Sequence, residues 1–151
     1  MLWDGARAIG ICVFSAPAVN LAGRNRYFGL SGTWSGVGLR AVSTQLVCLS
    51  RVVLDPAYRG AGIAVDFVRA SCRAQPFEWV EVMAEMGHLN PLFERAGFTR
   101  VETEMREGRN RAAHSDLWGT RTGVVGRKRL LRAESHAKSA WARPVYYVWR
   151  K

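Results

Sequence analysis

The segment spanning residues 52–64 places a strand, a tight turn and a helix next to one another, and it constrains the fold more than any other part of the chain. Residues 44–54 are rich in valine and leucine, which is typical of a buried central strand. The Asp-Pro dipeptide at 55–56 ends this strand, because proline fixes φ and has no N–H donor. In residues 60–73 the apolar side chains then recur with helical spacing. The segment therefore predicts a fold in which a buried strand feeds directly into a helix.

The turn in this segment is suited to bind a phosphate or a diphosphate. Glycine permits positive φ and a close approach of the backbone to a ligand, and the first turn of a helix presents unpaired N–H groups with a partial positive charge. An arginine beside them adds a charge-assisted hydrogen bond. A tight turn with good helix packing explains the same pattern, and the turn matches neither the Walker loop nor the G-x-G-x-x-G fingerprint. The residues expected to form this anion cradle are Arg59, Gly60, Ala61, Gly62, Ile63 and Ala64.

The remainder of the chain alternates between strand and helix patterns within what we expect to be a single domain, residues 1–151. Residues 18–41 are punctuated by glycine and predict a long loop with at most one short helical turn. Strands alternating with helices predict a partly parallel sheet that is covered on both faces. The further strands are expected at residues 8–16, 78–83, 98–105 and 144–150, and the further helices at residues 90–97 and 128–141.

Positive charge is concentrated in the last third of the chain. Residues 106–151 contain twelve lysines and arginines against three acidic residues, so they carry nine of the ten net positive charges. Such asymmetry indicates a polyanionic partner, although a solvated helix face accounts for it equally well. We interpret residues 106–143 as a basic insert before the last strand. The residues most suited to contact nucleic acid are Arg127, Lys128, Arg129 and Arg132.

Two motifs resemble the signatures of the GNAT superfamily of acyl-coenzyme A N-acyltransferases. The first is Arg59-x-x-Gly62-x-Ala64, and the second is the segment 90–98, NPLFERAGF, in which a short helix ends in Gly-Phe. The resemblance covers about residues 45–105. It implies an α/β (α+β) fold of three layers, whose mixed and mostly antiparallel sheet has a V-shaped splay at its centre. The fold would be abbreviated at its N-terminus, because the family usually has a strand and two helices before the strand at 8–16.

The resemblance also implies a cofactor, acetyl-coenzyme A or another acyl-coenzyme A, and transfer of its acyl group to an amine. By this resemblance Asn90 lies near the thioester and Phe93 lies against the cofactor. Many members have a tyrosine at the position of Phe93 that protonates the leaving thiolate, and phenylalanine cannot donate a proton. The strand residues that would present their backbone to the pantetheine arm are Val52, Val53 and Leu54.

Catalytic candidates lie on the next strand and directly after it. Glu81 and Glu85 are each suited to act as general base for an incoming amine, and His88 to accept a proton near neutral pH. With Asn90 they are the expected catalytic residues. The alternative interpretation is a pair of solvated glutamates at a strand end and a surface histidine.

Two other functions agree with the same sequence. One is modification of adenine in DNA, because the core and the basic character are similar to those of the GNAT-like Mom-type phage proteins. The other is a non-catalytic module that binds nucleic acid. No metal-ligand spacing, signal peptide or apolar run long enough to span a membrane is evident, so we expect no metal and a cytoplasmic location. The three cysteines lie in apolar stretches and are expected to be structural.

Overall fold

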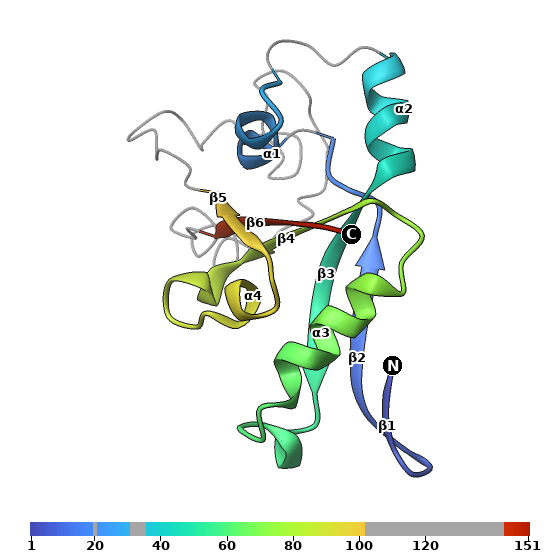
Figure 1. Ribbon diagram of the computed structural model, residues 1–151, viewed down its shortest axis with the longest axis vertical. Helices are drawn as coiled ribbons and strands as arrows, with labels where there is room; N and C mark the ends of the chain where they lie inside the picture. The colour runs from blue at the N-terminus through green and yellow to red at the C-terminus, as the bar shows by residue number, and fades with distance from the viewer. Residues whose placement is uncertain (20, 31–35, 102–143) are drawn as a thin grey trace, which may run out of the picture. The chain divides into compact units, whose positions relative to one another are not determined.

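A six-stranded mixed sheet forms the centre of the computed structural model, which describes residues 1–19, 21–30, 36–101 and 144–151 (Figure 1). All of these residues belong to one unit, which the chain re-enters at Pro144. The strands lie in the order β1-β2-β3-β4-β6-β5, and every neighbouring pair is antiparallel except β3 and β4. Their bounds are β1 Leu2–Asp4, β2 Arg7–Ser15, β3 Leu46–Leu54, β4 Trp79–Ala84, β5 Thr99–Val101 and β6 Val145–Arg150.

The parallel pair at the centre of the sheet is only partly joined. Its register runs from Leu46 opposite Trp79 to Cys48 opposite Glu81. Beyond Cys48, β3 stays paired with β2 but not with β4. In Figure 1 the two strands run apart after this point, β3 toward the anion cradle and β4 toward the fourth helix. The sheet therefore opens between two of its central strands.

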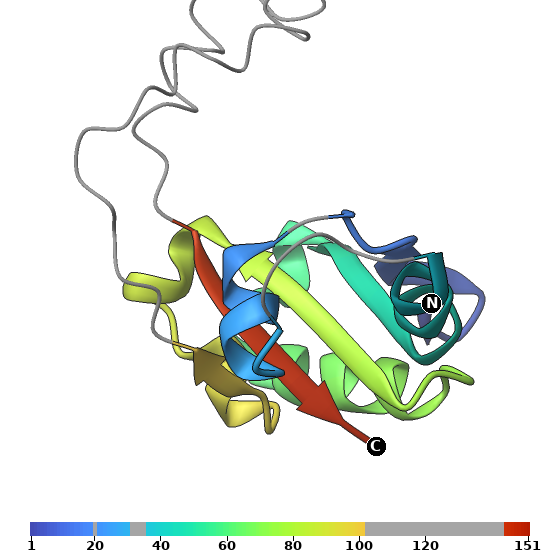
Figure 2. The same ribbon diagram turned by 90° about the horizontal axis from the view of Figure 1, so that it is seen from above.

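Helices cover both faces of the sheet (Figure 2). Two successive residues of β6 show the two sides of the sheet. Tyr147 packs in a core cluster with residues of α3 and α4, whereas Tyr146 contacts α1 on the opposite face. The sheet is thus the middle of three layers. The helical segments are α1 Ala22–Tyr27, α2 Gly36–Gln45, the 3-10 turn η1 Pro56–Tyr58, α3 Ile63–Arg73, the 3-10 turn η2 Glu85–His88 and α4 Leu92–Arg95.

Helix α3 follows directly from the pattern of its residues. Phe67, Val68 and Cys72 lie on one side of the helix and are buried, and a single apolar stripe of this kind is what holds a helix against a sheet. Gly62 at the N-cap has a φ of 78°, a left-handed conformation that glycine adopts without steric strain. The helix predicted after the Asp-Pro turn is confirmed, as are the four strands predicted around residues 8–16, 44–54, 78–83 and 144–150.

The prediction of a long loop over residues 18–41 is wrong, because α1 and most of α2 lie in this stretch. Glycine lowers helix propensity, and tertiary packing overrode that local signal. At Gly23 the glycine serves the packing, since a Cβ there would lie 2.5 Å from Cγ of Tyr146. These two helices follow β2, whereas the family resemblance places two helices before the strand at residues 8–16. Of the strand predicted at 98–105, residues 99–101 form β5; its remaining residues, the basic insert 106–143 and the helix at 128–141 lie outside the described residues.

None of the helices in the described part of the chain has the length and apolar character needed to cross a membrane.

Candidate functional site

The turn between β3 and α3 is held in place by Asp55. Its Oδ1 accepts a hydrogen bond from the N–H of Ala57 (2.9 Å), and its Oδ2 accepts one from the guanidinium of Arg7 (2.6 Å). The bond from Ala57 is the main reason why the pKa of Asp55 lies below its usual value, and the charge of Arg7 acts in the same direction. Asp55 therefore stays ionised and fixes where the chain leaves β3, as the Asp-Pro dipeptide predicted.

The anion cradle, residues Arg59 to Ala64, opens to solvent at the start of α3. Gly60 and Gly62 both have positive φ, 85° and 78°, and no atom lies within 4 Å of the position that a Cβ would take at either residue. No side chain caps the first turn of α3. The first N–H groups of a helix have no partner inside the helix, and no side chain takes that place here. The start of α3, with its partial positive charge, is therefore suited to an anion.

Arg59 lies between the cradle and the end of β3. Its Nε is 3.3 Å from the carbonyl oxygen of Leu54, to which it donates a hydrogen bond. This contact directs the side chain back along β3, and the exposed guanidinium is near the diverging part of that strand. Arg59 can thus offer a cation to a ligand that runs from the cradle into the opening beside β3.

The strand residues predicted to border the ligand occupy that opening. Val53 is 42 % exposed, whereas Val52 and Leu54 are partly buried. All three lie beyond Cys48, on the part of β3 that does not pair with β4. An edge that lacks its neighbouring strand has backbone N–H and C=O groups available for another partner. The structure therefore brings the cradle and this free strand edge together in one continuous region.

The residues after β4 are exposed around η2. Glu85 and Asn90 are exposed, and the N–H of Asn90 donates to the carbonyl of Met86 (2.8 Å). Nη2 of Arg100 lies 3.3 Å from Nδ1 of His88. A guanidinium can only donate, so Nδ1 accepts and Nε2 carries the ring proton in this arrangement. In this tautomer the Nε2–H of His88 can donate a hydrogen bond.

Phe93 lies in the hydrophobic core and is 9 % exposed. Its ring is 5.4 Å from that of Phe98 and 5.5 Å from that of Tyr147, measured between centroids. The hydroxyl of Tyr147 is within hydrogen-bond distance of Glu94 Oε1 (2.9 Å) and of the carbonyl of Gly87 (3.1 Å). Burial and the bond to Glu94 raise the pKa of Tyr147 to about 12. In this geometry Phe93 packs α4 onto β6, and contact with a cofactor remains a prediction.

Glu81 belongs to a buried ion pair, and its environment argues against the role of general base predicted for it. Both Glu81 and Arg24 are 0 % exposed. Arg24 donates from Nε to Oε2 (3.0 Å) and from Nη2 to Oε1 (2.6 Å) of Glu81, and the hydroxyl of Tyr146 donates to Oε2 (2.9 Å). Burial, followed by the charge of Glu81, raises the pKa of Tyr146 far above its usual value, so the hydroxyl stays protonated. A carboxylate with three donors and no access to solvent holds α1 on the sheet.

The sequence contains no local signal for this ion pair. Arg24 and Glu81 are 57 positions apart, and Tyr146 is 65 positions from Glu81. The alternating pattern of β4 predicted only that Glu81 shares a face with Trp79 and Met83. Arg24 itself stands between Gly23 and Asn25, in a stretch whose glycines predict a loop, so nothing near it indicates burial.

The cysteines are not activated nucleophiles. Burial is the largest cause of a raised pKa for Cys12, Cys48 and Cys72, and it takes Cys72 to about 12. A thiol with a raised pKa holds little of the reactive thiolate at neutral pH. Over the described ranges of the chain, no three His, Cys, Asp or Glu residues are grouped so that they could hold a metal ion.

Arg127, Lys128, Arg129 and Arg132, the predicted contacts to nucleic acid, lie outside the described residues. Comparisons of the chain with models of protein families, with curated proteins and with solved structures find no match.

Proposed function

We propose that this chain binds an acyl-coenzyme A and transfers its acyl group to an amine. The observation that carries the proposal is the coincidence of two features: an open cradle at the start of α3, and the free edge of β3 directly before it. The N–H groups of the cradle suit the diphosphate of the coenzyme. The free edge of β3 suits the pantetheine arm, whose two amides can pair with it like an added strand.

The topology of the sheet supports the same proposal. Among the described strands, β3 and β4 form the one parallel pair; they are also the pair that separates, and α3 connects them. This arrangement agrees with the V-shaped splay that the resemblance to the GNAT superfamily implies. The Arg59-x-x-Gly62-x-Ala64 motif spans the turn before α3 and the first residues of that helix, which supports the proposed position of the diphosphate.

The chemistry of the proposed transfer needs groups that position the amine and move one proton. When bound, the acyl-coenzyme A supplies a thioester carbonyl as the acceptor of the amine's electron pair. Glu85 is exposed and follows β4, so it is better placed than buried Glu81 to take the proton from the amine, directly or through water. His88, with its proton on Nε2, and Asn90 are suited to donate hydrogen bonds to the carbonyl or to the leaving sulfur.

Binding of acetyl-coenzyme A can be tested by thermal unfolding. A ligand present at 100 times its Kd stabilises the protein by about 2.7 kcal/mol, which for a chain of this size raises the Tm by roughly 5–10 °C. Release of free thiol in the presence of a panel of amines then measures the transfer. A Tm that does not change with millimolar acetyl-coenzyme A contradicts the proposal, and binding without any thiol release leaves only the binding part standing.

A nucleic-acid acceptor is the second candidate, favoured by the nine net positive charges of residues 106–151. Neutralising Arg127, Lys128, Arg129 and Arg132 to glutamine is expected to lower the slope of log K against log salt for duplex DNA by about 3–4. The binding is measured by fluorescence anisotropy at several salt concentrations. The control neutralises four exposed arginines of the described unit, Arg40, Arg51, Arg73 and Arg95. Equal losses in both variants would show attraction by net charge alone, and no binding at low salt excludes this candidate.

A further inference from the structure

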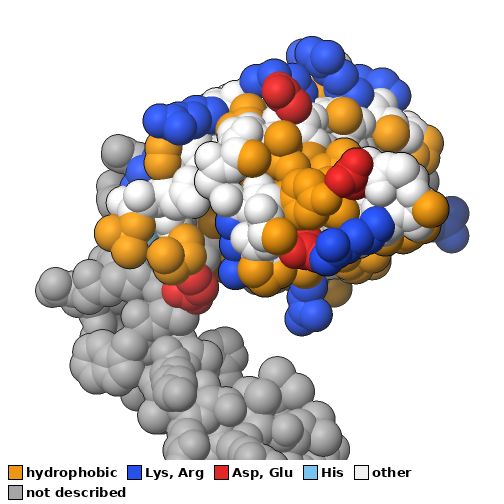
Figure 3. All heavy atoms as spheres, turned by 90° about the horizontal axis from the view of Figure 1, so that it is seen from below, with side chains coloured by type: hydrophobic (Ala, Val, Ile, Leu, Met, Phe, Trp, Pro, Cys, Tyr) orange, Lys and Arg blue, Asp and Glu red, His pale blue; other side chains and the backbone are white. Residues whose placement is uncertain are grey.

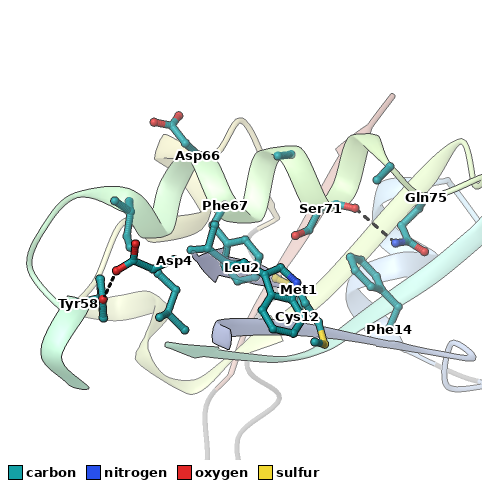
Figure 4. A pocket seen from close by; sticks show the side chains of 15 residues that line it. Met1, Leu2, Asp4, Cys12, Phe14, Tyr58, Asp66, Phe67, Ser71 and Gln75 are labelled. Carbon is teal, nitrogen blue, oxygen red and sulfur yellow. Dashed lines mark hydrogen bonds between the residues drawn. The ribbon is translucent and has the colours of Figure 1, made fainter. Parts of the chain in front are cut away.

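A groove of about 800 Å³ runs along α3 on the side that faces β1 and β2 (Figure 4). Its volume is within the range of roughly 300–1,000 Å³ that is typical of sites for small ligands. Ile63, Phe67 and Ala70, one helical turn apart on α3, form one wall with the C-cap residue Ala74, and Leu2, Ile9 and Phe14 contribute to the other. Figure 3 views the molecule from the side where β1, η1 and the start of α3 lie, and hydrophobic side chains are gathered there with carboxylates among them.

The end of the groove near the start of α3 differs chemically from the rest. Asp4 and Tyr58 lie at this end (Figure 4), and the hydroxyl of Tyr58 donates a hydrogen bond to Oδ2 of Asp4. The carboxylate of Asp66, which is bound by Arg69 (2.8 Å), points away from the groove on the other side of α3. Trp3, which is 54 % exposed, also lines the groove. This end therefore combines aromatic rings with the carboxylate of Asp4.

The same end adjoins the anion cradle. Ile63 and Tyr58 line the groove, and they flank the cradle residues from Arg59 to Gly62 in the chain. Among the described residues that line the groove there is no lysine or arginine. A ligand anchored by a diphosphate on the cradle would meet the carboxylate of Asp4 first if it extended into the groove.

We propose that this groove receives the purine base of the coenzyme, an inference that rests on the proposed binding of acyl-coenzyme A. A purine is flat and largely apolar, which suits the walls formed by Ile63, Phe67 and Trp3. Its exocyclic amine donates hydrogen bonds, and the carboxylate of Asp4 can accept one. The pantetheine arm leaves the cradle toward the opening between β3 and β4, and the adenosine leaves it on the opposite side of α3. The cradle is then the midpoint of one extended ligand site.

The test compares acetyl-coenzyme A with its 1,N6-etheno derivative, which is changed only at the base, and with S-acetyl-4′-phosphopantetheine, which lacks the whole 3′-phosphoadenosine and one phosphate of the diphosphate; isothermal titration calorimetry measures the affinities. The unmodified protein is expected to bind acetyl-coenzyme A at least about tenfold more tightly than the 1,N6-etheno derivative, whose exocyclic nitrogen cannot donate a hydrogen bond. Ala70→Trp fills the groove from α3 and should remove this preference while binding of S-acetyl-4′-phosphopantetheine stays within about twofold. Ala41→Trp is the matched control, since Ala41 is also an exposed helical alanine and lies on α2.

The outcomes separate the two proposals. If the unmodified protein binds none of these ligands, the proposed function fails. If it binds acetyl-coenzyme A and the 1,N6-etheno derivative equally, or if Ala70→Trp keeps the full preference between these two ligands, the groove is not the base site although the proposed function stands. Circular dichroism shows whether Ala70→Trp is folded. If it is not, the ligand comparison on the unmodified protein and on Asp4→Asn decides whether the groove binds the base.

Discussion

Gly62→Glu is expected to lower the affinity for acetyl-coenzyme A by at least about 100-fold. Gly62 is the N-cap of α3, and a side chain there would enter the open space in front of the first N–H groups. Two like charges about 4 Å apart repel by about 4 kcal/mol near a protein surface, and tenfold in affinity corresponds to about 1.4 kcal/mol. The added carboxylate would also accept the N–H bonds that the diphosphate requires. Isothermal titration calorimetry with acetyl-coenzyme A measures the loss.

The matched control is Gly29→Glu. Gly29 has a φ of 64° and has no atom within 4 Å of its Cβ position, so the substitution adds the same charge and the same backbone strain. That strain is roughly 1–2 kcal/mol in both variants, and it should lower their stabilities alike. Gly29→Glu should leave the affinity within about twofold, because Gly29 follows α1 and lies far from the cradle in the chain. Equal affinities for Gly62→Glu and the unmodified protein would place the diphosphate elsewhere.

Arg24→Met is expected to destabilise the fold by about 3–5 kcal/mol, because it leaves Glu81 buried without its cation. Glu81 keeps only the hydroxyl of Tyr146 as a donor in that variant. A loss of this size is a large fraction of the stability of an ordinary domain. Urea unfolding followed by circular dichroism gives the change in the free energy of unfolding.

The double variant Arg24→Met/Glu81→Met separates the penalty of an unpaired charge from the contribution of the ion pair. Replacing both partners by apolar side chains of similar size is often neutral or stabilising, so the double variant should regain most of the loss. Tyr146→Phe, which removes one donor from Glu81, should cost only about 1 kcal/mol. If the single variant loses under about 1 kcal/mol, Glu81 has access to water or a proton, and the general-base role predicted for it becomes tenable again.

The elements that follow from local chemistry could be predicted from the amino-acid sequence. The Asp-Pro stop after β3, the glycine entry into α3 and the alternation in β4 and β6 each depend on neighbours within a few positions. The same holds for Gly97, whose φ of 97° ends α4 as its place after the short helix indicated. Such signals act through backbone sterics and side-chain period, which are present before the chain folds.

The features that join distant segments could not be predicted in this way. Packing against Tyr146 outweighed the glycines of residues 18–41 and kept α1 helical, and an ion pair across 57 positions turned Glu81 from an expected catalytic group into a part of the core. The groove beside α3 exists only because the β1–β2 hairpin lies across from that helix. Burial, pairing and cavities are properties of surfaces that meet in three dimensions, so no local pattern of residues carries them.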